Sequence, residues 1–396
     1  MRNILITVLF ATFAVPLVAQ GYNKGLAAAH NGDYVAAFQE WKPLAEQGNA
    51  SAQFSLGLMF ADGTGVSQNY GNAFKWYKSA AEQGNSDAQF NLGLMFRNGT
   101  GVFRNDQEAF RLTKLAAEQS HSEAQFNLGV MFINGQGVSK SQAEAFKWTK
   151  LAAEQGHAEA QGSLGYFYRA GVGVSRNLNE AFKWNKLAAE QGDAVAQGNL
   201  GSIYYLGDGR FRDYAKAFKW YKLAAEQDIP EAQFNLGIMY LNGQGVIQNK
   251  TEAFKWYSLA AEQGDTKAQL LMGLTFRNGE FLPQDYRKAL KWWSLAAKQG
   301  DIQAHLFLGV LYDTGEGVLQ NYGKAFRLYK FAAEKGDPEA QFQLGMLYLN
   351  GTGVFQNYNE AINWFKLATG SGNKRATSKL AEMSSAGHNI SQDITN

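Results

Sequence analysis

Two stretches of the sequence resemble motifs of catalytic or phosphate-binding sites, and each lacks residues that the chemistry requires. Gly317–Lys324 reads GVLQNYGK. It has one residue too many between its glycines, and Ala325 follows where a phosphate-binding loop needs Ser or Thr. Ser371–Lys374 has the Ser-x-x-Lys spacing of an acyl-transferring serine without its partner motifs. A Gly-x-Ser-x-Gly elbow is absent. We therefore predict no catalytic residues, no cofactor and a protein that is not an enzyme.

Histidines are the other candidates for chemistry. There are five, at positions 30, 121, 157, 305 and 388. His121 and His157 are 36 residues apart and occupy equivalent turns. Stacked helices are roughly 8–10 Å apart, which is too far for the two rings to share a metal ion. We predict that both histidines cap helices and that the chain has no metal site.

Composition excludes several further classes of function. The 396 residues include 37 basic and 35 acidic side chains, and the net charge is +2. This near-balance, without a basic run interleaved with aromatic residues, argues against a dedicated nucleic-acid binder. Cysteine is absent, which excludes disulfides, thiolate zinc sites and a cysteine nucleophile.

The first residues read MRNILITVLFATFAVPLVAQ. Arg2 provides a positive start, an apolar segment follows, and Ala19 is a small residue suited to cleavage. Residues 1–19 are therefore predicted to be a signal peptide, cleaved after Ala19, and the mature protein is expected to be periplasmic or secreted. A retained N-terminal anchor is the alternative. No other apolar run reaches about 18 residues, so we expect no stable membrane insertion after cleavage.

The elements that carry these residues repeat with a fixed period. A Leu-Gly pair, once Met-Gly, recurs with its glycine at positions 57, 93, 129, 165, 201, 237, 273, 309 and 345. Every interval is 36 residues, and an Ala-Gln pair keeps the same period except at Ala304-His305. The spacing of small and apolar residues predicts two helices per repeat, at about 50–61 and 70–83 in the first. We name them helix A and helix B. Gly63 and Gly65 separate them.

A lone helix pair cannot bury its apolar faces, whereas a stack of pairs can. We therefore predict an all-α solenoid with nine repeats over residues 49–372. A capping helix pair is expected at 20–48, and a capping helix with a frayed tail at 373–396. The last helix is flanked by Lys374, Arg375, Lys379 and Glu382, which give it the polar outer face of a cap.

The consensus AQFNLGxMFxNGxGV, followed by AFKWYxLAAEQG, resembles the Sel1-like repeat over about Gly32 to Leu380. This resemblance implies a right-handed α/α superhelix of antiparallel helix pairs, related to tetratricopeptide arrays. Helix A would line its concave face and helix B its convex face. Members of the family are mostly adaptors and binding scaffolds. Some exported relatives are cysteine-rich and linked to β-lactamase activity, and this chain departs from them because it has no cysteine.

A ligand would bind where the repeats differ. In helix A of the first repeat the variable positions are 54, 58 and 61, whose spacing places them on one stripe. We call the equivalent positions of all nine repeats the helix A stripe. Two aromatic rings are lost from it at positions 162 and 198. We predict a hollow there, against the alternative of neutral repeat drift. Its predicted partner-binding residues are Phe126, Gly162, Tyr166, Arg169, Gly198, Ser202, Tyr205 and Phe234.

Three functions remain open at this stage. The favoured one is an exported, non-enzymatic scaffold that binds a protein or peptide through helix A, in envelope function or host interaction. By analogy with the cysteine-rich relatives, a β-lactamase-like or cell-wall-precursor-binding protein is the first alternative. A structural oligomer of the envelope, bound through the convex face, is the second.

Overall fold

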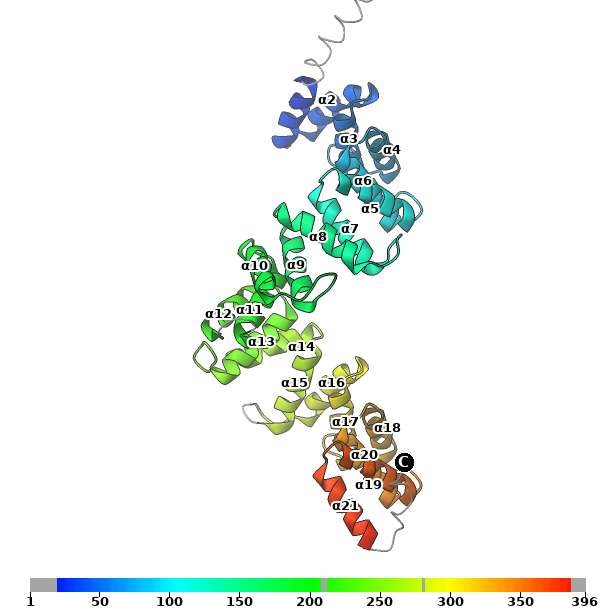
Figure 1. Ribbon diagram of the computed structural model, residues 1–396, viewed down its shortest axis with the longest axis vertical. Coiled ribbons are helices and arrows are strands. Elements are labelled where there is room, and N and C mark those ends of the chain that lie inside the picture. The colour runs from blue at the N-terminus through cyan, green and yellow to red at the C-terminus, as the bar shows by residue number, and fades with distance from the viewer. Residues whose placement is uncertain (1–19, 208–211, 280–281, 386–396) are drawn as a thin grey trace, which may run out of the picture. The chain divides into compact units, whose positions relative to one another are not determined.

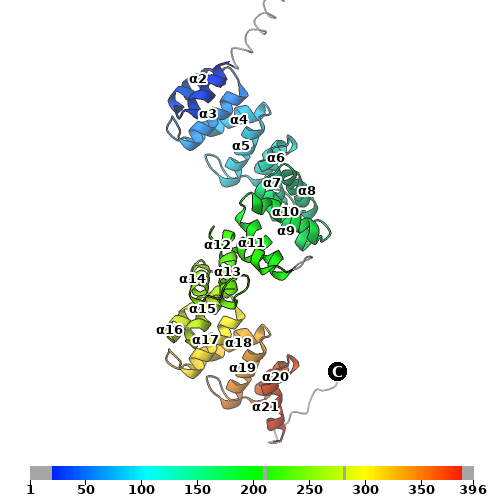
Figure 2. The same cartoon turned by 90° about the vertical axis from the view of Figure 1, so that its left-hand side faces the viewer.

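The computed structural model describes residues 20–207, 212–279 and 282–385, all of them helices, turns and loops without a strand (Figures 1 and 2). The chain divides into two compact units, Met1–Leu200 and Gly201–Asn396, and the division falls within one helix, α11 (Ala194–Leu206). We call these unit 1 and unit 2. The predicted signal peptide, residues 1–19, and the end of the predicted tail, residues 386–396, lie outside the described residues.

In unit 1 residues 20–30 are helical and precede nine further helices. These are α2 (Tyr34–Glu46), α3 (Ala50–Asp62), α4 (Tyr70–Glu82), α5 (Ser86–Asn98), α6 (Asp106–Glu118), α7 (Ser122–Asn134), α8 (Gln142–Glu154), α9 (Ala158–Ala170) and α10 (Leu178–Glu190). Unit 2 continues with α12 (Tyr214–Ala225), α13 (Pro230–Asn242), α14 (Lys250–Glu262), α15 (Thr266–Asn278), α16 (Tyr286–Lys298), α17 (Ile302–Thr314), α18 (Tyr322–Glu334), α19 (Pro338–Asn350), α20 (Tyr358–Gly370) and α21 (Lys374–Ser385).

Within each unit, a helix packs against the helices that precede and follow it in the sequence. Helix A of the first repeat is α3 and its helix B is α4, so the predicted bounds hold within a residue or so. The prediction of an all-α fold built from repeated helix pairs is thereby confirmed. The right-handed sense of the superhelix and the capping roles of residues 20–48 and 373–396 stay predictions. Among the described residues, no helix is long and apolar enough to cross a membrane.

The helix boundaries follow from short local signals. Asn49 caps α3, because its Oδ1 accepts a hydrogen bond of 2.8 Å from the backbone N–H of Ala52. At the other end, Gly63 has a φ of +74°, the left-handed conformation that glycine adopts without steric cost. Its N–H donates to the carbonyl of Met59. The same capping pattern recurs in most repeats of both units, whereas Ile229 at the start of α13 makes no side-chain cap.

The glycine of the Leu-Gly pair marks the closest approach of helix A to helix B. A Cβ placed on Gly345 would lie 2.6 Å from Cε1 of Phe365, the buried ring on helix B of the same repeat. The equivalent glycines meet the equivalent helix B side chain in each repeat, which is Tyr221 at Gly201 and Thr113 at Gly93. Glycine costs a helix roughly 1 kcal/mol relative to alanine. The close packing of the two helices accounts for its presence here.

Candidate functional site

Phe126 and Gly162 lie at equivalent positions of α7 and α9, in unit 1. The ring of Phe126 packs on the imidazole of His157, with centroids 4.9 Å apart. At Gly162 the facing residue is Asp193 instead of histidine. A Cβ on Gly162 would lie 3.4 Å from its Oδ1, at ordinary contact distance. The loss of the ring at 162 therefore accompanies a second change, from histidine to aspartate, on the facing turn.

Tyr166 and Arg169 follow Gly162 on α9, one helical turn apart. Tyr166 is 48% exposed, and Arg169 is half-buried. Neither side chain forms a hydrogen bond or an ion pair with any described residue. Two arginines at positions equivalent to Arg169 have polar partners. Nη1 of Arg97 donates a hydrogen bond of 2.9 Å to Oδ1 of Asn127, and Nε of Arg277 lies 3.9 Å from a carboxylate oxygen of Glu316. Among the described residues, the polar ends of Tyr166 and Arg169 therefore have no hydrogen-bond or ion-pair partner.

The remaining predicted residues are Gly198, Ser202, Tyr205 and Phe234. Gly198 is half-buried at the end of unit 1. In unit 2, the hydroxyl of Ser202 accepts a hydrogen bond of 3.0 Å from Tyr221. Tyr205 donates to Oε1 of Gln244 at 3.0 Å, and Phe234 packs against a buried cluster. Five of the eight predicted residues belong to unit 1 and three to unit 2, and the hollow that would unite them stays a prediction.

One carboxyl group on the helix A stripe has a perturbed environment. Asp313, at the end of α17, accepts a hydrogen bond of 3.2 Å from the hydroxyl of Tyr329. Burial raises the pKa of Asp313 above its ordinary value, and the hydrogen bond from Tyr329 opposes this shift. Burial likewise raises the pKa of Tyr329. The pair lies in a packed contact between helices A and B.

The histidines at the turns act as predicted. Nδ1 of His121 accepts a hydrogen bond of 3.1 Å from the N–H of Ala124, and Nδ1 of His157 accepts one of 3.2 Å from Ala160. Both are N-caps of helix A. Nε2 of His157 lies 2.8 Å from a carboxylate oxygen of Glu123. No group of three potential metal ligands occurs among the described residues. His388 lies outside them.

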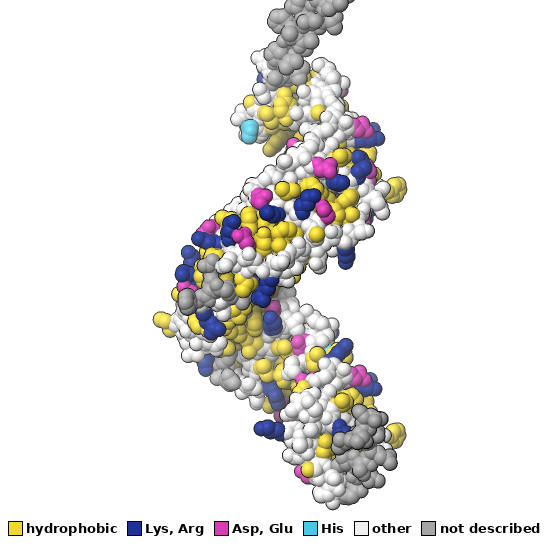
Figure 3. All heavy atoms as spheres, viewed as in Figure 1, with side chains coloured by type: hydrophobic (Ala, Val, Ile, Leu, Met, Phe, Trp, Pro, Cys, Tyr) yellow, Lys and Arg dark blue, Asp and Glu magenta, His cyan; other side chains and the backbone are white. Residues whose placement is uncertain are grey.

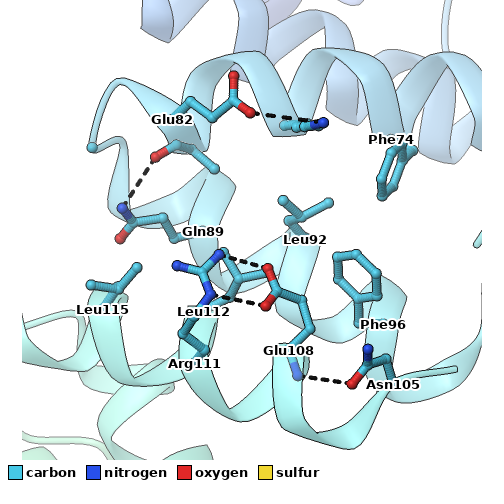
Figure 4. A pocket seen from close by; sticks show the side chains of 13 residues that line it. Phe74, Glu82, Gln89, Leu92, Phe96, Asn105, Glu108, Arg111, Leu112 and Leu115 are labelled. Atoms are coloured by element: carbon cyan, nitrogen blue, oxygen red, sulfur yellow. Dashed lines mark hydrogen bonds and ion pairs between the residues drawn. The ribbon is translucent and has the colours of Figure 1, made fainter.

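Sequence reasoning did not predict a pocket on the helix B side. In unit 1 a hollow of about 580 Å³ lies between α4 and α6, with α5 behind it (Figure 4). Leu92 and Leu112 line its apolar part, and Glu108 and Arg111 its polar part. Figure 3 shows basic and acidic side chains interspersed over the visible face, with hydrophobic side chains between them. A recessed surface therefore exists on the helix B side of unit 1.

Comparison with known families decides the identity of the repeat. The family model of the Sel1 repeat matches nine consecutive segments, at residues 50–85, 86–121, 122–157, 158–193, 194–229, 230–265, 266–301, 302–337 and 338–373. The chain belongs to the Sel1 repeat family. The resemblance inferred from the consensus is therefore confirmed. Sel1 repeat proteins are generally non-enzymatic scaffolds for protein–protein interactions.

Solved structures of Sel1 repeat proteins agree with this assignment. A protective antigen of uropathogenic Escherichia coli strains, which displays an SLR fold, is 33% identical with a TM-score of 0.81. The match covers 95% of this Sel1 repeat chain and 81% of the antigen. A Sel1 repeat protein from Oxalobacter formigenes is also 33% identical, with a TM-score of 0.58, over 78% of this chain and 89% of its own. No curated protein matches the chain.

The pocket of this Sel1 repeat protein escaped sequence reasoning for an identifiable reason. The family resemblance predicts a ligand on helix A, where apolar residues change size from repeat to repeat. The signal on helix B is a change of charge at fixed positions of the repeat. Aligning the repeats shows it: Glu82 and Glu108 correspond to Lys298 and Lys324, six repeats later.

Proposed function

We propose that this Sel1 repeat protein is an exported, non-enzymatic scaffold that binds a protein or peptide through the helix A stripe. The observation that carries the proposal is the pair Tyr166 and Arg169 in unit 1. Tyrosine and arginine are enriched among the residues that dominate binding energy at interfaces. Arg169 has no partner among the described residues, and an arginine can hold a carboxylate through two parallel hydrogen bonds.

The rest of the stripe supports this assignment. One buried position of helix A keeps nearly the same size from repeat to repeat, as Leu56, Leu128 and Leu164 show. The stripe residues are only partly constrained by packing, and they vary from repeat to repeat. The change from Phe126 with His157 to Gly162 with Asp193 removes two rings from neighbouring elements. Variation at partly exposed positions such as Tyr166 is what a ligand-specific surface requires.

Photo-crosslinking tests the binding face. A photoreactive amino acid replaces Tyr166 in one variant and the exposed Lys147, on helix B, in the control. Crosslinks in the producing cell should form from position 166 and not from 147. The crosslinked partner is then purified, and its affinity is measured for the wild type, Tyr166→Ala and Arg169→Ala. We expect about a ten-fold loss for each variant. Equal crosslinking from both positions, with unchanged affinities, contradicts the proposal.

A second pair of variants tests the hollow. Gly162→Phe combined with Asp193→His rebuilds the aromatic contact seen between Phe126 and His157. If the hollow receives the partner, this double variant folds normally and loses affinity. If repeat drift explains Gly162, folding and affinity both stay at the wild-type level.

Hydrolysis of a chromogenic β-lactam by the pure protein would overturn the non-enzymatic assignment.

The export part of the proposal rests on the sequence of residues 1–19. N-terminal sequencing of the protein from a bacterial host should give Gln20 as the first residue, in the periplasmic or culture fraction. An intact Met1 start in the cytoplasmic fraction contradicts export. This result is independent of the binding experiments, so the two parts of the proposal can fail separately.

A further inference from the structure

A second pocket lies on the helix B side of unit 2. It has a volume of about 410 Å³ and lies between the B helices α16 and α18, with helix A α17 behind it. Ala297, Leu308 and Leu328 provide its apolar surface, and Leu308 is 5% exposed. The pocket therefore combines a hydrophobic interior with an open rim.

This pocket is the repeat equivalent of the one in unit 1. Leu308 corresponds to Leu92, and Arg327 corresponds to Arg111, each six repeats later. The apolar surface is therefore conserved between the two pockets of the same chain. What differs is the charge around it, so the unit 1 pocket serves as an internal reference.

In unit 1 the cations beside the pocket are neutralised. The Arg111 guanidinium donates two hydrogen bonds to Glu108, at 2.9 and 2.6 Å, and Nζ of Lys78 lies 3.8 Å from Glu82 (Figure 4). The Arg111 guanidinium also holds the pKa of Glu108 below its ordinary value. An anionic ligand would have to displace these carboxylates before it could contact Arg111 or Lys78.

In unit 2 both of those carboxylates are replaced by lysine. Lys298 stands at the position of Glu82 and Lys324 at that of Glu108, while Arg327 is retained. None of these three cations forms an ion pair with a carboxylate in the described part of the chain. The Lys324 ammonium lies 4.9 Å from the ring centre of Tyr312. The two flanking helices, α16 and α18, carry seven basic side chains and one acidic one, Glu334.

The wall of the pocket changes at one more position. His305, in the wall of this pocket, stands at a position where the other repeats have a buried glutamine. Gln89 is the equivalent residue in the unit 1 pocket. Nδ1 of His305 donates to the carbonyl of Asp301 at 2.6 Å, because a carbonyl oxygen can only accept. The imidazole stacks on Phe331 with centroids 3.9 Å apart. Its Nε2 forms no hydrogen bond with a described residue and adds a polar group to the pocket.

We propose that this pocket binds an acidic peptide segment, with an apolar side chain on Leu308 and Leu328 and carboxylates on Lys298, Lys324 and Arg327. Charge complementarity selects an anion, since the hollow is surrounded by three cations that have no ion pair with a described residue. The apolar interior selects a side chain between the anionic groups. A flat anionic bilayer would reach the rim but leave the interior empty, and nucleic acid would gain nothing from the leucines.

The site lies on B helices of unit 2 and does not depend on Tyr166, Arg169 or the helix A stripe. Failure of the proposal above leaves this one intact, and the reverse also holds. Each requires its own variants, because no residue is shared between the two surfaces.

Fluorescence polarisation with a labelled peptide tests the site. The probe is a peptide in which leucine is flanked on both sides by glutamates, and the control probe has glutamine in their place. The double variant Lys298→Glu/Lys324→Glu restores the residue types of unit 1. Lys250→Glu/Lys267→Glu changes the net charge equally, at exposed positions of α14 and α15.

We expect the pocket variant to lose about ten-fold in affinity for the glutamate probe, since each exposed charge pair contributes modestly. The control variant should stay within about two-fold of the wild type. Wild-type affinity should fall as salt rises from about 0.01 M to about 0.15 M. Equal losses in both variants indicate a net-charge effect and overturn the proposal. Unchanged affinity in the pocket variant does the same, as does equal binding of the glutamine probe.

A gain-of-function variant gives the reciprocal test. Glu82→Lys/Glu108→Lys places in unit 1 the two lysines of the unit 2 pocket, beside Lys78 where unit 2 has Ser294, and titration should then show a second peptide site. Binding to anionic vesicles is measured in parallel. Vesicle binding that depends on Lys298 and Lys324, with no binding of the glutamate peptide, overturns the peptide assignment in favour of a membrane surface.

Discussion

The side chains of Gln125 and Gln155 are joined by a hydrogen bond of 2.7 Å, from Nε2 of Gln155 to Oε1 of Gln125. Gln125 is only 4% exposed, and its own Nε2 donates to the carbonyl of Ala117 at 3.1 Å. One amide on helix A thus connects the C-terminal ends of two B helices, α6 and α8. The same pair of bonds recurs in other repeats, among them those of Gln53, Gln89, Gln161, Gln233 and Gln269.

Replacing Gln125 by alanine should therefore weaken the stack. The substitution removes two hydrogen bonds, one to the carbonyl of Ala117 and one from Gln155, while the Ala117 carbonyl keeps the backbone N–H of Ser120 as a donor. At about 0.5–1.5 kcal/mol for each lost hydrogen bond, we expect a loss of about 1–3 kcal/mol in urea unfolding followed by circular dichroism. Gln107→Ala, at an exposed position of α6, is the control and should change stability by less than about 0.5 kcal/mol. Equal effects of the two variants would show that the Gln125 amide has no structural role.

Gly345→Ala should destabilise unit 2 although alanine is the better helix former. The added Cβ would lie 2.6 Å from the ring of Phe365, which is fully buried and has no room to withdraw. Overpacking of this kind costs about 1–3 kcal/mol. Gly323→Ala is the control, because the nearest atom to its added Cβ is 3.5 Å away. It should stabilise by about 0.4–1 kcal/mol.

A double-mutant cycle identifies the cause of the loss at Gly345. Phe365→Leu shortens the side chain that meets the new Cβ, so Gly345→Ala should cost less in that background than in the wild type. Additive losses would show that the strain at Gly345 arises elsewhere. Unfolding midpoints in urea for the four proteins provide the measurement.

The 36-residue period made the fold predictable, but it did not predict which side chains of the candidate site form pairs. The glycines at 36-residue intervals, with alanines and aromatic residues in fixed phase, leave one arrangement in which every helix pair is covered. The same glycines mark the close approach that Gly345 and Phe365 make. Pairing of side chains does not follow from period alone. Arg97 and Arg169 share a position, yet only Arg97 is bound by an asparagine of the next repeat.

The sequence pattern also did not predict that charged residues of helix B surround a pocket. A helix surface rich in lysine and glutamate is ordinarily a solvated face, and most of these residues do form pairs one turn apart, as Lys114 and Glu118 do. Only the structure shows that positions 298, 324 and 327 surround a hollow. The exchange of two glutamates for lysines then has a consequence for binding, which the sequence alone does not reveal.

His157→Ala should destabilise unit 1 by about 0.5–2 kcal/mol, since it removes the acceptor that caps α9 at the N–H of Ala160. His157→Asn should recover most of this loss. Asparagine caps the equivalent helix at Asn85, where its Oδ1 accepts from Ala88 at 2.8 Å. Thermal unfolding of the three proteins measures the effect. If Asn and Ala were equally destabilising, the contact of His157 with Phe126 would dominate over the cap.

Asp313 predicts how stability depends on pH. Its pKa is raised by burial above the ordinary value of 3.8, so the folded protein favours the protonated form. The contribution of Asp313 to the free energy of unfolding is therefore fully present below pH 3.8. It is lost as the pH rises through the pKa of the folded state. Asp313→Asn removes the charge and keeps an oxygen that accepts from Tyr329. Relative to the wild type, its melting temperature should be higher at about pH 7 and similar at about pH 3.

Glu108→Gln provides the control with the opposite sign. Hydrogen bonds from Arg111 lower the pKa of Glu108, so its contribution is present above its ordinary value of 4.5 and is lost as the pH falls through the lower value of the folded state. This variant should melt below the wild type at about pH 7 and match it only at strongly acid pH. A lower melting temperature for Asp313→Asn at neutral pH would contradict the interpretation. It would mean that the charged carboxylate gains more from the hydroxyl of Tyr329 than burial costs it.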